Sequence, residues 1–288
     1  MNDAPTPTGE SVESIRREID RVDDAILGLV AERLRLGDGI AAAKPAGLPI
    51  RPGREITMLR RLIAAAPAHL DRELVVELWR ALIAANVRRQ RVVDVLVGGG
   101  RGDPTRLFDI ARRHFGARAR IQHVGEPQAA LQKLLEKPDE CVAVTPWATA
   151  PGVGSWWPAL SESRFAKLHL IAGLPVAGAA SDDPEASVFA VAEPEEAGGD
   201  ITLILAFDPH HRAQRALNEA GLVGKEVTRS EPRIILRVEG FVGTHDPRAA
   251  ALARALDRPQ VVRRIARPNP KPPVAVRPLP PASRGCRP

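Results

Sequence analysis

Apolar positions recur at alternating spacings of four and three residues along the first part of the chain. This pattern predicts one amphipathic helix from about Val12 to Lys44, roughly 45–50 Å long at the helical rise per residue. Ser11 marks its start, and Pro45 with Gly47 marks its end. The stripe consists of Ile15, Ile19, Val22, Ile26, Leu29, Leu36 and Ile40. A helix of this length exceeds the width of a small monomeric bundle, so we expect the stripe to be buried against a second copy, in a homodimer.

Two shorter helices are predicted next, over about Gly53–Ala65 and Asp71–Val93. The pattern then changes to short β-branched runs that alternate with amphipathic stretches, which is typical of an α/β region. The expected strands are Val92–Val97, Ile121–Val124, Val142–Val144, Leu168–Ile171 and Val188–Val191, and the expected helices are Thr105–Phe115 and Pro127–Leu135.

The last predicted elements follow the order strand, helix, strand, strand, helix, strand, which is the order of a ferredoxin-like βαββαβ unit. They cover Ile201–Phe207, Arg212–Ala220, Lys225–Arg229, Ile234–Glu239, Pro247–Leu256 and Val261–Ala266. The expected organisation is a disordered N-terminus at 1–10, an all-α domain at 11–91, an α/β region at 92–197, the βαββαβ unit at 198–267 and a proline-rich basic tail at 268–288. We therefore predict a multidomain fold.

Composition narrows the possible partners. The chain has 41 Lys and Arg against 35 Asp and Glu, a net charge of +6, but no acidic residue follows Asp257, so the preceding body is close to neutral. Aromatic residues make up 3% and tyrosine is absent, which argues against stacking on single-stranded nucleic acid. The polar segment Met1–Glu10 lacks the apolar core of a signal peptide, and no run approaches the ~18 apolar residues of a membrane span. We expect a cytoplasmic protein that binds neither nucleic acid nor membrane.

Several polar residues break apolar stripes. Position 33 of the long helix should be apolar and is Arg33, and Lys44 returns to the same face about three turns later. On the third helix Asn86 and Gln90 continue an apolar stripe, and Arg16 adds a further cation. Cations and amides in an apolar bundle predict a pocket for a small anion, because guanidinium groups bind carboxylates bidentately. The alternative is that Arg33 pairs with a nearby carboxylate and Lys44 caps its helix.

Other residues favour structural roles. Trp147, Trp156 and Trp157 are expected to pack between domains, and Cys141 is expected to lie in a buried strand. The seven histidines show no spacing typical of a metal site.

The helical region contains the motifs IRREIDRVDDAILGLVAERLRLGDGIAAAK, RPGRE, MLRRL and LWRALIAANVRRQ. These resemble the all-helical, AroQ-class chorismate mutases. The family's early Arg, its Asp seven residues later, its Glu-Arg pair and its closing Ala-Lys correspond to Arg16, Asp23, Glu32–Arg33 and Ala43–Lys44. The resemblance implies an isomerase that rearranges chorismate to prephenate in aromatic amino acid biosynthesis. The rearrangement is intramolecular and uses no cofactor, metal or nucleophile, so positioning and electrostatics supply the rate.

The resemblance also implies roles for individual residues. Lys44 and Gln90 would be catalytic, donating hydrogen bonds to the ether oxygen of the breaking bond. The implied substrate-binding residues are Arg16 from the partner subunit, Arg33, Arg54, Glu55 and Asn86. Glu55, with Arg54 beside it, would meet the substrate hydroxyl. Asn86 stands where many relatives have Ser, and Pro52–Gly53 replaces a loop that often carries an Asp.

The order of regions resembles the bifunctional chorismate mutase–prephenate dehydratase proteins, whose dehydratase is followed by an ACT domain. The motifs of the second half differ: Val144–Ala150 lacks the carboxylate and amide of the dehydratase motif, and Ser187–Phe189 has Val188 in place of its arginine. Thr228–Pro232 is a scrambled version of the ACT effector motif. We therefore expect degenerate dehydratase-like and ACT-like regions. The alternatives are a working mutase–dehydratase, and a non-catalytic regulatory or binding protein that uses the helices to dimerise.

Overall fold

The computed structural model describes residues 11–42, 47–100, 103–150, 154–176, 183–243, 245–256 and 264–265. The predictions for Lys44, for the N-terminus at 1–10 and for the tail at 268–288 lie outside these residues.

Three helices open the chain: α1 (Val12–Ala42), α2 (Pro52–Ala65) and α3 (Arg72–Gln90). The Asp71 side chain caps α3 by accepting a hydrogen bond from the backbone of Glu73. The predicted end of this helix at Val93 is wrong. Arg91 is already extended, with φ −161° and ψ 148°, and the chain passes from it into the first strand.

A mixed five-stranded sheet, sheet A, follows the helices and confirms the predicted α/β region. Its strands are β1 (Asp94–Val97), β2 (Arg120–His123), β3 (Cys141–Pro146), β4 (His169–Leu174) and β5 (Ala186–Ala190), in the order β2-β1-β3-β5-β4. β1 pairs parallel with β2 and β3, whereas β5 is antiparallel to β3 and β4. The connecting helices are α4 (Pro104–Phe115), α5 (Pro127–Glu136) and the short 3-10 turns Trp157–Ser161 and Ser163–Phe165. The two 3-10 turns were not predicted.

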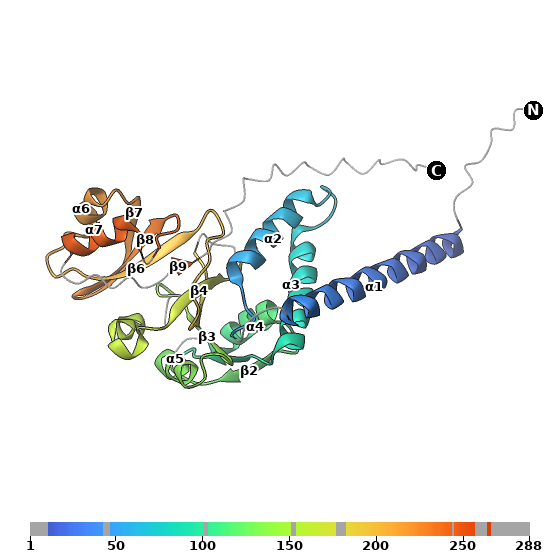
Figure 1. Ribbon diagram of the computed structural model, residues 1–288, viewed down its shortest axis with the longest axis horizontal. Helices are drawn as coiled ribbons and strands as arrows, with labels where there is room; N and C mark the ends of the chain where they lie inside the picture. Colours follow the sequence, from blue (N-terminus) through green and yellow to red (C-terminus); the bar gives the residue numbers. More distant parts are fainter. Residues whose placement is uncertain are drawn as a thin grey trace, which may run out of the picture.

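Period-two alternation along β1 sends its side chains into two different cores. Val95 and Val97 belong to a cluster that contains Leu107 of α4 and Ile56 of α2. Leu96 belongs to the opposite cluster, with residues of α5. Helices α2 and α4 therefore share one core with sheet A, and Figure 1 shows them on the side of the sheet away from sheet B.

Sheet B is a second, antiparallel sheet. It contains β6 (Ile201–Phe207), β7 (Gly224–Ser230), β8 (Arg233–Glu239) and β9 (Arg264–Ile265) in the order β7-β8-β6-β9, with helices α6 (Ala213–Glu219) and α7 (Pro247–Ala255). The described elements follow the predicted order. Leu203 and Leu205 of β6 face sheet A, while Ile204 packs with α6 and α7.

The core between the two sheets contains the three tryptophans, Trp147, Trp156 and Trp157, so their predicted packing between regions is confirmed. Cys141 lies in the same cluster, and burial raises the pKa of its thiol. It is a free cysteine in a buried strand, as predicted.

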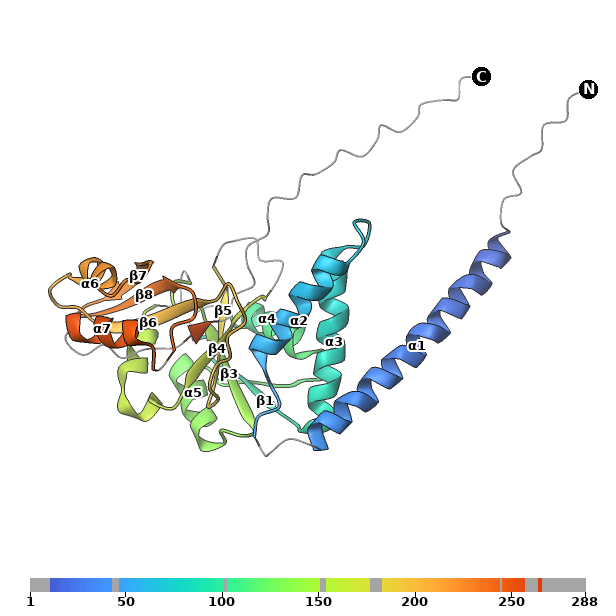
Figure 2. The same ribbon diagram turned by 45° about the horizontal axis from the view of Figure 1, so that its top comes forward.

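Helix α1 differs from every other element because it projects from the body of the molecule (Figure 2). Its predicted apolar stripe is exposed: Ile19 is 53% exposed, Ile26 49% and Leu29 66%. Helices α1 and α3 approach each other at the C-terminal end of α1 and diverge from there, and α3 exposes Leu74 and Leu78. Within the described residues, no helix has the combination of length and apolar character that crossing a bilayer requires.

Candidate active site

Helices α1 and α3 pack closely against each other at Gly37. A Cβ atom at this position would lie 2.6 Å from Nδ2 of Asn86, so the helices approach as closely as they do because residue 37 has no side chain. Beside this contact, the Arg89 guanidinium donates hydrogen bonds to both carboxylate oxygens of Asp38, at 2.8 and 2.5 Å. The junction therefore has a fixed register.

Two buried polar atoms at this junction have no hydrogen-bond partner among the described residues. They are Nη1 of Arg33, which precedes Gly37 by one turn of α1, and Oδ1 of Asn86. Burial lowers the pKa of the Arg33 guanidinium, which nevertheless stays charged. The half-buried Gln90 follows Asn86 by one turn of α3. Unsatisfied buried donors and acceptors are costly, so this cluster of Arg33, Asn86 and Gln90 has the character of a binding site for a polar ligand.

Arg16 is remote from that cluster in the same chain. It lies ~25 Å before Arg33 along the axis of α1, at 1.5 Å per residue. Its side chain is exposed and approaches Glu13 at 3.7 Å. A site that uses both arginines would therefore draw Arg16 from another copy of the chain.

Glu55 lies in a second polar cluster, at the start of α2. Its Oε2 accepts a hydrogen bond from Nη1 of Arg80 at 2.9 Å, and its Oε1 accepts one from the backbone N–H of Arg51 at 3.3 Å. The side chains of Glu55 and Arg80 are only 11% and 7% exposed. Arg54, predicted beside Glu55, is exposed.

Arg80 also reaches the α/β region. Its Nε donates to the carbonyl oxygen of His114 at 3.2 Å, and its Nη2 lies 3.3 Å from Nε2 of the same residue. Arginine has no acceptor, so Nε2 of His114 accepts and the imidazole is neutral. Burial, followed by the nearby Arg80 charge, holds the pKa of His114 well below its usual value. Arg80 was not predicted from the sequence. It lies among Val75, Ile83 and Ala84 on the buried face of α3, so it is a polar residue at an apolar position, as Arg33 is.

The neutral state of His114 predicts that acid destabilises the fold. An unfolded chain protonates this residue near pH 6.5, whereas the folded chain resists protonation, so stability falls as the pH drops below that value. When the pH is lowered from 7.5 to 5.5, the free energy of unfolding of the wild-type protein should fall by about 1 kcal/mol more than that of a His114→Gln variant. Urea unfolding of both proteins at the two pH values measures the difference. Equal losses in the two proteins would contradict this assignment.

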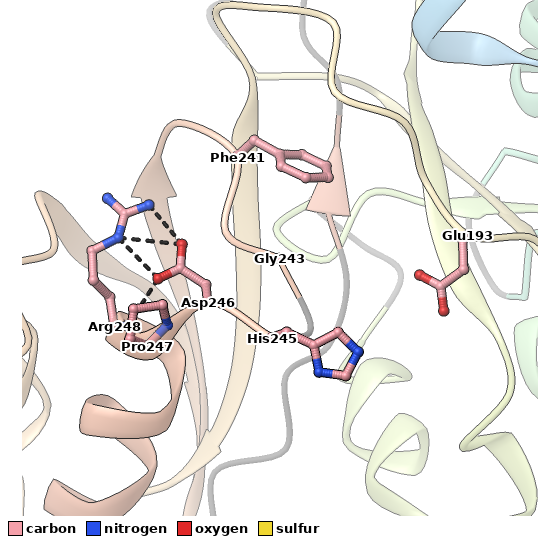
Figure 3. Close-up of a pocket in the computed structure, with 7 residues that line it drawn as sticks. All are labelled: Glu193, Phe241, Gly243, His245, Asp246, Pro247 and Arg248. Carbon is pink, nitrogen blue, oxygen red and sulfur yellow. Dashed lines mark hydrogen bonds and ion pairs between the residues drawn. The ribbon is translucent and has the colours of Figure 1, made fainter.

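A separate cavity of about 860 Å³ lies between the loop before α7 and the segment after β5 (Figure 3). Its lining residues are Glu193, Phe241, Gly243, His245, Asp246, Pro247 and Arg248. The carboxylate of Asp246 already pairs with Arg248, at 2.7 Å, and Glu193 lies 3.5 Å from His169. None of the predicted site residues that the structure describes lines this cavity. In the part of the chain that the structure describes, no group of three or more His, Cys, Asp or Glu residues is arranged to hold a metal ion.

In sheet B, the charges of the predicted effector segment Thr228–Pro232 are paired within the chain. Arg229 lies 2.5 Å from Glu226, 3.2 Å from Asp208 and 3.3 Å from Glu231. The hydrogen bond to Glu226 is the main cause that raises the pKa of Arg229. The Arg229 guanidinium is therefore already paired with acidic side chains of the same chain, whereas binding an acidic ligand would need it to be available.

Comparison with known proteins shows which family the helical segment is similar to. Residues 15–91 match the chorismate mutase type II family, which confirms the predicted resemblance for these helices.

The individual relatives are bifunctional proteins. The chain is 25% identical over 135 residues to the bifunctional chorismate mutase/prephenate dehydratase of Stutzerimonas stutzeri, an alignment that covers 44% of this chain and 35% of the relative. It is 32% identical over 101 residues to the protein of the same name from Neisseria gonorrhoeae, covering 35% of this chain and 27% of the relative. The alignments thus span between about a quarter and a third of the length of these curated relatives. No solved structure matches the chain.

Proposed function

We propose that this protein is a chorismate mutase, which rearranges chorismate to prephenate in aromatic amino acid biosynthesis. The observation that carries the proposal is the pair of buried polar atoms on Arg33 and Asn86, which have no hydrogen-bond partner in the described part of the chain and lie near the turn of α3 that carries Gln90. The family match of residues 15–91 supports it, because that segment contains all three residues.

The proposed mechanism is positioning combined with electrostatic stabilisation. Arg33 binds one substrate carboxylate and so favours the compact conformer in which the bond-forming carbon atoms are close. Gln90 and Lys44 donate hydrogen bonds to the ether oxygen, which gains negative charge as its bond to carbon breaks. Asn86 supplies a further hydrogen bond. Glu55, with Arg54 beside it, accepts a hydrogen bond from the substrate hydroxyl.

The proposed active form is a homodimer in which the helices of the two copies intertwine. The exposed stripe of α1, together with Leu74 and Leu78 of α3, is the apolar surface that a second α1 would cover. The partner subunit's Arg16 would bind the second carboxylate, which its distance from Arg33 within one chain supports.

The remainder of the chain is proposed to be a degenerate dehydratase-like region at 92–197 and an ACT-like, ferredoxin-like unit at 198–267. The sheet order β7-β8-β6-β9, with α6 and α7, supports the second assignment. Loss of the effector motif and the internal pairing of Arg229 argue against effector binding in the usual geometry.

Chorismate consumption tests the proposed function. We expect the purified full-length chain to deplete chorismate absorbance with prephenate as the product, and without the phenylpyruvate that a dehydratase would form. Formation of phenylpyruvate by the enzyme would support the bifunctional alternative. Failure to consume chorismate would favour the non-catalytic alternative, in which the helices serve only dimerisation.

A further inference from the structure

Glu55 is supported on both of its carboxylate oxygens by residues that are themselves anchored outside the helical region. Oε2 accepts from Arg80 at 2.9 Å, and Arg80 in turn donates to His114 at 3.2 Å. Oε1 accepts from the backbone of Arg51, and the guanidinium of Arg51 donates through Nε to Glu195 at 2.7 Å. His114 lies in the last turn of α4, and Glu195 lies between β5 and β6.

The anchors leave α2 little freedom to shift. Gly53 of α2 packs tightly against the segment between β5 and β6. A Cβ atom at this position would lie 2.8 Å from the carbonyl oxygen of Glu195. Five residues beyond Glu55, Arg60 donates to the carbonyl oxygens of Ala197, at 2.5 Å, and of Gly198. On the opposite side, a Cβ at Gly116 would lie 2.8 Å from Cβ of Ala84, so α3 is pressed onto the end of α4.

We propose that Arg80, His114 and Glu195 are positioning residues that hold the Glu55 carboxylate for the substrate hydroxyl, which makes the region after residue 91 a structural part of the mutase site. This proposal rests on the proposed function. A carboxylate has about four acceptor positions, and within the described residues Glu55 uses one on each oxygen, so a hydrogen bond from a hydroxyl can still be accepted. The buried Arg80 fixes the direction in which the remaining positions point, since both residues are almost fully enclosed.

The arrangement gives the α/β region a function that does not need dehydratase chemistry. In this region, the backbone carbonyl and the imidazole of His114 bind Arg80. In the segment after β5, the carboxylate of Glu195 binds Arg51. The helices alone would lack both supports.

A double-mutant cycle tests whether Arg80 acts through Glu55. We expect Arg80→Gln and Glu55→Gln each to reduce kcat/KM for chorismate about 10- to 100-fold, and the double variant to be no worse than either single variant. Glu77→Gln, an exposed site on the same helix, is the matched control and should behave as wild type. Multiplicative losses in the double variant would show that Arg80 acts independently of Glu55 and would overturn the proposal.

Arg80→Gln breaks a buried ion pair and can prevent folding, so a milder variant is needed. The Arg51–Glu195 pair is partly exposed, at 40% and 36%. We expect Glu195→Gln to raise KM about three- to tenfold with kcat nearly unchanged, while Glu196→Gln, next to it and exposed, changes neither. An unchanged KM in Glu195→Gln overturns the inference and leaves the proposed function intact. A wild-type chain that does not consume chorismate overturns both.

Discussion

Replacing Arg33 with alanine is expected to lower kcat/KM for chorismate about 100- to 1000-fold, the usual effect of removing one preorganised charged donor from an active site. The Nη1 atom of Arg33 is buried and has no hydrogen-bond partner among the described residues, so this nitrogen can donate to a ligand carboxylate without first losing such a bond. The measurement is initial-rate kinetics by chorismate absorbance.

Arg35 is the matched control for this variant. It lies two residues further along α1 and is exposed, so Arg35→Ala should retain wild-type activity. Arg33→Lys should recover only part of the loss, because an ammonium group cannot bind a carboxylate through two parallel hydrogen bonds. The folded state should tolerate Arg33→Ala, since the substitution removes a buried Nη1 donor that makes no hydrogen bond to any described residue. Full mutase activity in Arg33→Ala would end the assignment of this site.

Local sequence pattern was sufficient to predict most of the helices and strands and to single out candidate site residues. β6 occupies Ile201–Phe207 as predicted, because a β-branched run bounded by polar residues has few alternatives. The end of α3 was placed too late because Val92 and Val93 continue the apolar pattern of the helix. Arg33 and Asn86 could be singled out from the sequence because each is a polar residue at an apolar position, and each has a buried polar atom without a hydrogen-bond partner among the described residues.

Contacts between residues far apart in the sequence could not be predicted in this way. Arg80 finds its partners 25 and 34 residues away, on α2 and α4, and no spacing rule connects these positions. The close approach at Gly37 depends equally on how two helices meet. Periodicity shows which face of a helix is buried, whereas the partner on that face is set by tertiary packing.

The stripe of α1 leads to the second large effect: Ile19→Glu combined with Ile26→Glu should convert the proposed dimer to a monomer. The two side chains are 53% and 49% exposed in one chain. Burying an aliphatic side chain contributes about 1.5–3 kcal/mol, so four lost contacts per dimer should weaken association by more than about a thousandfold. Sedimentation or light scattering measures the mass. Leu27→Glu with Ala31→Glu adds the same charge on the opposite face of α1 and should leave the mass unchanged.

Mixing two inactive variants then tests whether each site is shared between copies. If the partner subunit's Arg16 acts with Arg33, a heterodimer of an Arg16→Ala chain and an Arg33→Ala chain contains one site with both arginines intact. Statistical re-association of equal amounts of the two chains should therefore restore about a quarter of wild-type activity. Such recovery is impossible if both arginines serve a site within one chain, because every mixed site would then lack one of them. Activity that stays at the level of the separate variants would contradict the shared site, even if the protein is a dimer.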